Sequence, residues 1–384
     1  MNGVVAPQPR RVAYVSGTRA DFGLMRAALA AIHATPGLEL GIIVTGMHLS
    51  PKFGTTVADI EGAGLPIVGR VPVDLAASTA LSTARSLGVM TTGIADALAA
   101  WRADVVLLLG DRGEMLAAAT AAAYLGLPAV HLHGGERSGT VDEPVRHAIS
   151  KLATFHLVAT EESRGRLLRM GEADERIAVV GAPGLDDILA APRADRGSLC
   201  VARGLDPGRP VALAVYHPVQ HVAGEGAAAV RDLVDACRAR GLQVLALRPN
   251  SDEGSDDIRV VLDALAVDPD TRVLTHLGRG EFVSWMAEAE VMVGNSSAGI
   301  IEAASFGTPV VNVGVRQRLR ERNACVIDCG TSRASIDAAL DAALQRGRLP
   351  PANVYGDGHT AARIAAFLRD LDASPSLLVK CNGY

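Results

Sequence analysis

The sequence is poor in aromatic residues and cysteines, and it has no long apolar run. Aromatic side chains make up 3% of the 384 residues, so surfaces that stack nucleic-acid bases are not expected. The five cysteines are odd in number and follow no zinc-binding spacing, which indicates reduced thiols rather than disulfides. No stretch approaches the roughly 18 apolar residues of a membrane helix. Neither nucleic acid nor a membrane is therefore expected as a partner.

A strong charge imbalance is also missing. The chain has 37 Lys and Arg residues against 42 Asp and Glu residues, and its formal net charge is −5. This balance gives no electrostatic reason to bind nucleic acid or an anionic membrane. The N-terminal residues lack the apolar core of a signal peptide, so we expect a cytoplasmic protein. An apolar content of 49% and the chain length predict a globular protein with two domains.

Short apolar runs alternate with longer amphipathic segments. Strands are expected at 12–16, 38–45, 105–110, 129–133, 157–159 and 177–180, and again at 211–215, 242–247, 272–276, 291–293, 310–313 and 326–328. Helices are expected between them, among others at 23–33, 53–63, 81–101, 113–125 and 163–170. This alternation predicts parallel sheets covered by helices on both faces. We predict an α/β protein of two Rossmann-like domains, 1–182 and 183–358, with a final helix at 359–372 that returns to the first domain.

The segment 131–147 follows an expected strand and is dense in titratable groups. It holds three histidines, three carboxylates and two arginines. Ligands of parallel α/β sheets bind beyond the carboxyl ends of the strands, so the loops of both domains are expected to face one cleft. Glu136 and Asp142 lie on one such loop, where a dry environment can separate two carboxyl pKa values and provide a base and an acid. His133 and His147 are explained equally well by catalysis and by structure.

Two other strand ends in the first half carry an arginine near an aspartate. Arg19 and Asp21 follow the first strand at the start of a helix, where backbone N–H groups and the helix dipole can hold a phosphate together with Arg19. Asp111 and Arg112 follow the strand at 105–110 and can hold a phosphate and orient a catalytic partner. Each aspartate is also explained as a helix N-cap.

The second half contains its strongest motif at 294–302, where Gly-Asn-Ser-Ser opens a helix directly after a strand. Its backbone N–H groups, with Ser296 and Ser297, can cradle a diphosphate, and Glu302 lies where a carboxylate could accept both hydroxyls of a ribose. A capped helix with a solvated Glu302 is the alternative. Further polar residues at expected strand ends are His217, Asn250, His276 and Arg316.

No cofactor is expected. The sequence has no Gly-x-Gly-x-x-Gly and no phosphate-loop lysine motif, so NAD or ATP binding of the usual kinds is unsupported. Arg19, Arg112 and Arg316, with a helix N-terminus, can bind a diphosphate without a metal ion.

Taken together, these motifs resemble the UDP-N-acetylglucosamine 2-epimerase family, and its hydrolysing branch most of all. The resemblance extends from about residue 12 to residue 371. Its markers are Arg19-Ala-Asp21, Gly46-Met-His48, Gly110-Asp-Arg112, His133-Gly-Gly-Glu136, the stretch 142–151, His217-Pro218, Gly294-Asn-Ser-Ser297 and Arg316-Gln317. Any one of them is moderately specific, and this many in order are highly specific.

The resemblance implies a GT-B fold, a UDP-sugar in the cleft, no metal or redox cofactor, and a homodimer or tetramer. In the hydrolysing branch, a base removes the hydrogen on carbon 2 and UDP leaves carbon 1 by anti elimination. Water then adds to the 2-acetamidoglucal, which releases N-acetylmannosamine and UDP for sialic-acid-type biosynthesis. The positive groups described above would stabilise the charge that develops on the leaving diphosphate.

Site roles follow from the resemblance by position. Asp111, Glu136 and Asp142 are the acid/base candidates, and His48 would line the sugar pocket. Some family members carry Glu where this chain has His133, so His133 and Asp142 are both candidates for the base. Residues expected to bind the phosphates are Arg19, Arg112, His217, Ser296, Ser297 and Arg316, with Glu302 on the ribose. Asp21, Asn250 and His276 complete the expected substrate-binding set.

Three alternatives compete with this interpretation. A non-hydrolysing 2-epimerase would return the glucal to UDP, but Gly134-Gly135-Glu136 looks more like the hydrolysing branch. A GT-B glycosyltransferase is disfavoured by the carboxylate-rich loop at 136–143, and a non-catalytic nucleotide-sugar-binding regulator by the presence of all three carboxylates. The substrate stays open, because relatives use N-acetylglucosamine or 4-acetamido-6-deoxy sugars on UDP or GDP.

Overall fold

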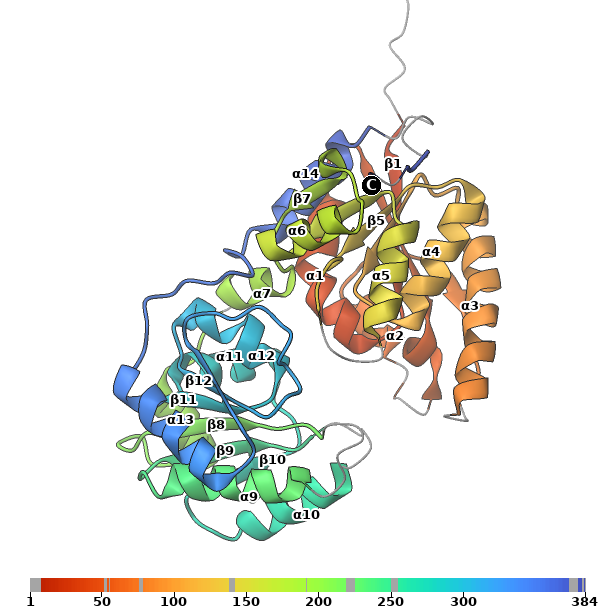
Figure 1. Ribbon diagram of the computed structural model, residues 1–384. Helices are drawn as coiled ribbons and strands as arrows, with labels where there is room; N and C mark the ends of the chain where they lie inside the picture. The colour runs from red at the N-terminus through yellow and green to blue at the C-terminus, as the bar shows by residue number, and fades with distance from the viewer. Residues whose placement is uncertain are drawn as a thin grey trace, which may run out of the picture. The chain divides into compact units, whose positions relative to one another are not determined.

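The chain separates into two compact units. The computed structural model describes residues 8–51, 54, 56–75, 79–137, 142–190, 192–218, 225–249, 255–372, 379–381 and 383. Unit 1 comprises Met1–Asp187 with Tyr355–Tyr384, and unit 2 comprises Ile188–Val354 (Figure 1). The domain limits 1–182 and 183–358 stay a prediction.

Unit 1 is built on a parallel sheet of seven described strands in the order β3-β2-β1-β4-β5-β6-β7. The strands are β1 (Arg10–Ser16), β2 (Leu38–Thr45), β3 (Ile67–Val71), β4 (Val105–Leu109), β5 (Ala129–Leu132), β6 (Phe155–Val158) and β7 (Ile177–Val179). The inner strands β1 and β4 are almost continuously buried, as strands covered on both faces must be.

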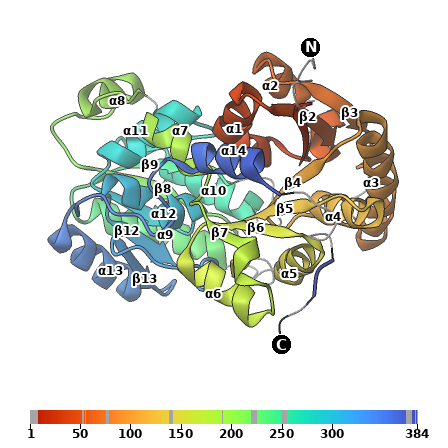
Figure 2. The same ribbon diagram turned by 90° about the horizontal axis from the view of Figure 1, so that it is seen from above.

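Helices cover both faces of this sheet (Figure 2). They are α1 (Arg19–Ala34), α2 (Val57–Gly62), α3 (Ala80–Trp101), α4 (Gly113–Leu125), α5 (Glu143–Leu152), α6 (Glu161–Arg169) and α14 (Thr360–Asp370), while α7 (Gly184–Ala190) crosses the boundary between the units. Residues of α1 and α14 form one core with the sheet, and residues of α3, α4 and α5 form the core on the other face. The final helix thus packs in unit 1.

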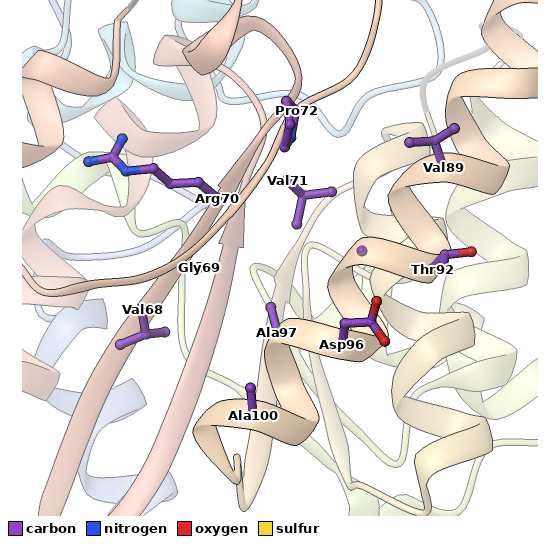
Figure 3. A pocket seen from close by; sticks show the side chains of 11 residues that line it. Val68, Gly69, Arg70, Val71, Pro72, Val89, Thr92, Asp96, Ala97 and Ala100 are labelled. Carbon is purple, nitrogen blue, oxygen red and sulfur yellow. The ribbon is translucent and has the colours of Figure 1, made fainter.

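Strand β3 was not expected from the sequence. It is an edge strand of five residues in which Val71 alone is buried, and Gly69 and Arg70 interrupt its apolar pattern. Helix α3 approaches it closely, because a Cβ on Gly69 would lie 2.9 Å from the Cβ of Ala97. A groove of about 710 Å³ lies between β3 and α3, and none of the expected site residues lines it (Figure 3).

Unit 2 repeats the arrangement with a parallel sheet of six described strands, in the order β10-β9-β8-β11-β12-β13. The strands are β8 (Val211–Val215), β9 (Gln243–Leu247), β10 (Thr271–Leu274), β11 (Val291–Gly294), β12 (Val310–Val313) and β13 (Val326–Cys329). The helices are α8 (Arg196–Arg203), α9 (Glu225–Arg238), α10 (Ser255–Leu265), α11 (Arg279–Glu288), α12 (Ser297–Ile301) and α13 (Arg333–Arg346). Buried residues of α9, α10 and α13 form one core with the sheet.

Each sheet has a point at which the strand order reverses. In unit 1 the order runs outward from the neighbours β1 and β4, and in unit 2 it runs outward from β8 and β11. Loops at the carboxyl ends of such neighbours diverge and leave room for a ligand. The two candidate binding regions are therefore these reversal points.

Candidate active site

The reversal point of unit 1 brings together the loops that follow β1, β4 and β5. Arg146 on α5 connects two of them. Its side chain is 4% exposed, and it donates to a carboxylate oxygen of Asp111 and, over 2.8 Å, to the carbonyl oxygen of His133. The same guanidinium lies 3.7 Å from Glu136 Oε2. Three of the four expected acid/base residues, Asp111, His133 and Glu136, thus meet around a buried arginine.

His133 and Glu136 form a close pair. His133 Nδ1 contacts Glu136 Oε1, and the two side chains are 13% and 9% exposed. With Nδ1 facing a carboxylate, a neutral imidazole carries its proton there and keeps its lone pair on Nε2. Strand β5 ends at Leu132, and His133 has a φ of +59°, a left-handed conformation that non-glycine residues adopt at a cost. His133 therefore occupies a backbone position that its surroundings must hold in place.

Asp142, the fourth acid/base candidate, is the exposed N-cap residue of α5. Partial desolvation, followed by the negative charge of Asp111, raises the pKa of Asp142, whereas Arg112 and Arg146 oppose the shift. A carboxyl group with a raised pKa is better suited to give up a proton as a general acid than an ordinary aspartate.

The loop after β4 rests on a buried histidine. Burial lowers the pKa of His131 to about 3, so this ring is neutral. Its Nε2 lies 2.7 Å from the carbonyl oxygen of Gly110 and its Nδ1 lies 3.1 Å from Ser150 Oγ. His131 therefore joins β5, α5 and the residue before Asp111.

Asp21 and His48 form a buried network under the loop after β1. Asp21 is the capping-box residue of α1 and accepts from the backbone N–H groups of Gly17 (3.0 Å) and Thr18 (2.7 Å). Ser16 Oγ contacts the other oxygen of Asp21 and lies 2.9 Å from His48 Nε2. Burial raises the pKa of Asp21 and lowers that of His48. Both residues thus support the loop, and direct contact with a substrate stays a prediction for each.

Two arginines at this end of the sheet are accessible. Arg19 opens α1 with 66% of its side chain exposed and pairs with Asp59 over 2.9 Å. Arg112, 49% exposed, bonds Glu114 over 3.3 Å. Glu114 is buried, and a Cβ on Gly17 would lie 2.5 Å from its Cγ. Glu114 and Arg146 were not among the site residues expected from the sequence, although Glu114 stands two residues after Arg112 and Arg146 two residues after a helix-starting proline.

The reversal point of unit 2 is organised by Asn295. This residue is fully buried, its Oδ1 accepts from the His217 N–H (2.7 Å) and its Nδ2 donates to the His217 carbonyl (2.8 Å). Its own carbonyl accepts from Arg316 Nη1 and from Gln317 Nε2, each over 3.1 Å. The loops after β8, β11 and β12 are therefore tied together, and they carry His217, the two serines and Arg316.

Ser296 caps α12, with its Oγ accepting from the N–H of Ala298 over 3.3 Å, and Ser297 is the first helical residue. Glu302 lies at the end of α12 instead of within a longer helix. It pairs with Arg279 over 2.8 Å, and burial raises its pKa although Arg279 acts in the opposite direction. A buried carboxylate that is paired with an arginine in this way is suited to accept hydrogen bonds from hydroxyl groups.

One expected binding residue lies apart from this arrangement. His276 is exposed and follows the edge strand β10, two strands away from β8. Asn250 lies outside the described residues. Binding by either residue stays a prediction.

Two Rossmann-like units with parallel sheets define a GT-B protein. The crystal structure of UDP-GlcNAc 2-epimerase from Neisseria meningitidis bound to UDP-GlcNAc has the same fold, with a TM-score of 0.78 at 17% identity over 93% of this chain and 99% of that one. Residues 30–369 match the sequence profile of UDP-N-acetylglucosamine 2-epimerase, and the chain belongs to this family.

Two relatives have more specific names. A UDP-N,N'-diacetylbacillosamine 2-epimerase (hydrolyzing) of Legionella pneumophila is 47% identical over 98% of this chain and 100% of its own length. A GDP/UDP-N,N'-diacetylbacillosamine 2-epimerase (hydrolyzing) of Campylobacter jejuni is 32% identical over 83% of this chain and 84% of its own. Among the described residues, no helix is both long and apolar enough to cross a membrane.

Proposed function

We propose that the protein is a hydrolysing 2-epimerase of UDP-linked 2-acetamido sugars, which releases UDP and the free sugar inverted at carbon 2. The observation that carries the proposal is the cluster of Asp111, His133 and Glu136 around Arg146, with Asp142 at the start of the same helix. Elimination across carbons 1 and 2 followed by hydration needs a base and an acid, and this cluster offers both.

The proposed base is the His133 imidazole. Its Nε2 lone pair would take the proton from carbon 2, and the Glu136 carboxylate on Nδ1 would stabilise the imidazolium that forms. The carbon–oxygen bond at carbon 1 would break as the double bond of the glucal forms, and UDP would leave with the electron pair. Asp142, with its raised pKa, would donate a proton to carbon 2 as water adds to carbon 1. The proton released by this water would return Asp142 to its acid form, and the His133 imidazolium would lose its proton to solvent. Asp142 as the base is the alternative.

Binding of the nucleotide is proposed for the second unit. The α12 N-terminus with Ser296 and Ser297, the Arg316 side chain and His217 would take the diphosphate, and Glu302 would take the ribose hydroxyls. In unit 1, Arg19 and Arg112 would stabilise the charge on the departing diphosphate.

We infer that UDP-N,N'-diacetylbacillosamine is the preferred substrate and that UDP-N-acetylglucosamine is the second candidate. The support is the full-length match to the Legionella protein of that name. The free sugar would then enter sialic-acid-type biosynthesis. A cytoplasmic location and a homodimeric or tetrameric state are part of the proposal, and cell fractionation and light scattering test them.

Proton NMR in D2O with each sugar nucleotide tests the function. We expect free 2-acetamido sugar carrying deuterium at carbon 2, together with an equimolar amount of UDP. A UDP-linked epimer would instead indicate the non-hydrolysing reaction. No change with either compound would contradict the proposal.

A further inference from the structure

Arg146 is a buried cation that contacts residues from two different loops. It lies in the first turn of α5, two residues after Pro144, and only 4% of its side chain is exposed. Its two terminal nitrogens are directed to different partners. Nη2 donates to Asp111 after β4, and Nη1 donates to the His133 carbonyl after β5 and lies near Glu136. A buried charge is stable only when it is paired and hydrogen-bonded in this way.

The planar guanidinium is well suited to bind the Asp111 carboxylate and the His133 carbonyl at the same time. It presents N–H groups in a fixed fork, whereas a lysine ammonium is a point charge on a flexible stem. One end can therefore hold a carboxylate while the other holds a carbonyl, which sets the spacing between Asp111 and His133. The hydrogen bond to the His133 carbonyl also helps to hold the left-handed backbone of this residue, whose φ is +59°.

We propose that Arg146 is a positioning residue for the reaction, which sets the distance between Asp111 and the His133–Glu136 pair without contacting the sugar. The inference rests on the proposed epimerase activity. It predicts a specific kinetic signature, because a misplaced acid/base pair slows the chemical step while the nucleotide binds as before.

The test compares Arg146→Lys, which keeps the charge and loses the fork, with a matched variant elsewhere in unit 1. Arg10→Lys serves as the match, because Arg10 also bonds backbone carbonyls, those of Leu368 and Leu371, at the end of α14. For each protein, kcat and KM are measured with the sugar nucleotide that wild type turns over, UDP affinity by calorimetry, and folding by thermal denaturation.

We expect Arg146→Lys to lower kcat about 10²-fold, the scale for a small displacement of catalytic groups, with KM and the UDP Kd within about threefold of wild type. Arg10→Lys should lower the melting temperature and leave kcat unchanged. In the double variant Asp111→Asn/Arg146→Lys, the loss should be smaller than the product of the single losses, since both substitutions break the same contact.

A wild-type kcat in Arg146→Lys would overturn the inference, and so would a parallel loss of kcat and thermal stability in both arginine variants. Should Arg146→Lys not fold, a crystal structure of the wild-type protein with UDP decides: a guanidinium away from Asp111 and the His133 carbonyl refutes the role. Wild-type protein that is inactive on both sugar nucleotides would refute the proposed function instead.

Discussion

Among the single residues of the site, the carboxyl groups of Asp142 and Asp111 lie in different environments. Asp142 is exposed at the start of α5, and the negative charge of Asp111 helps to raise its pKa. Asp111 instead accepts a hydrogen bond from the buried guanidinium of Arg146. Two neighbouring aspartates with different partners can therefore take different tasks, Asp142 as a proton donor and Asp111 as the partner of the buried arginine.

Asp142→Asn should reduce turnover by at least about 10²-fold, the usual contribution of a general acid or base, while UDP binds with unchanged affinity. If Asp142 acts in its protonated form, the wild-type rate should fall as pH rises through the raised pKa, because deprotonation removes the donor. The pH profile of kcat and calorimetry with UDP check both points. Unchanged turnover in the variant would remove Asp142 from the mechanism.

The exposed arginines lead to a prediction about metal ions. Arg19 and Arg112 supply positive charge at the reversal point of unit 1, so the charge on the leaving diphosphate can be stabilised by the protein alone. Addition of EDTA should leave the initial rate unchanged in a UDP-release assay. A rate that EDTA abolishes and magnesium restores would contradict this expectation.

At the scale of elements, the binding loops depend on ties between strand ends. Gly294 has a φ of +130°, and a Cβ there would lie 2.0 Å from the Val215 carbonyl oxygen, so only glycine allows β11 to end against β8 in this way. Asn295 then pairs with both backbone groups of His217. The loop that carries the serines is thus shaped by its neighbours as much as by its own sequence.

Asn295→Ala should weaken UDP binding roughly tenfold, which corresponds to about 1.4 kcal/mol, because both backbone groups of His217 lose their side-chain partner and the loop is released. Asn312→Ala is the matched control. Asn312 is equally buried in unit 2, but its amide bonds Asp328 between β12 and β13. Calorimetry should find normal UDP affinity in the control. Equal affinities in the two variants would show that Asn295 does not organise the loop.

In the whole molecule, Lys380 near the C-terminal end joins an ion cluster around the buried Glu172. Lys380 Nζ lies 2.6 Å from Glu172 and donates to the carbonyls of Ser150 and Ala153 at the end of α5, each over 2.8 Å. Glu172 also meets His156 and Lys151. Burial opposes ionisation of Glu172, but the bonds from His156 and Lys380 outweigh it and lower its pKa to about 2.

Lys380→Met should destabilise the protein by about 2 kcal/mol at pH 7, the scale of hydrogen bonds to a charged group. Because the folded-state pKa of Glu172 is lowered, the stabilisation is present above the ordinary value of 4.5 and is lost as pH falls towards about 2. Denaturant unfolding at pH 7 and pH 3 should find a smaller difference between variant and wild type at pH 3. Cys381→Ser, at an exposed position, should match wild type.

Much of the fold followed from the sequence, since buried parallel strands leave apolar runs and helices leave their own period. Strand β3 did not, because an edge strand with Gly69 and Arg70 has no such pattern. The loops that hold Asp111, His133 and Ser296 were also foreseeable, because polar residues at strand ends mark ligand sites.

The two α/β series, their order and the positions of the reactive side chains along the chain can thus all be predicted from local sequence patterns. Three contacts become visible only in the tertiary structure: Arg146 joins Asp111 to His133, Ser16 meets the buried His48, and Lys380 pairs with Glu172. These contacts join residues far apart in sequence, and their geometry depends on how strands align and loops turn. Local patterns carry no information about such distances.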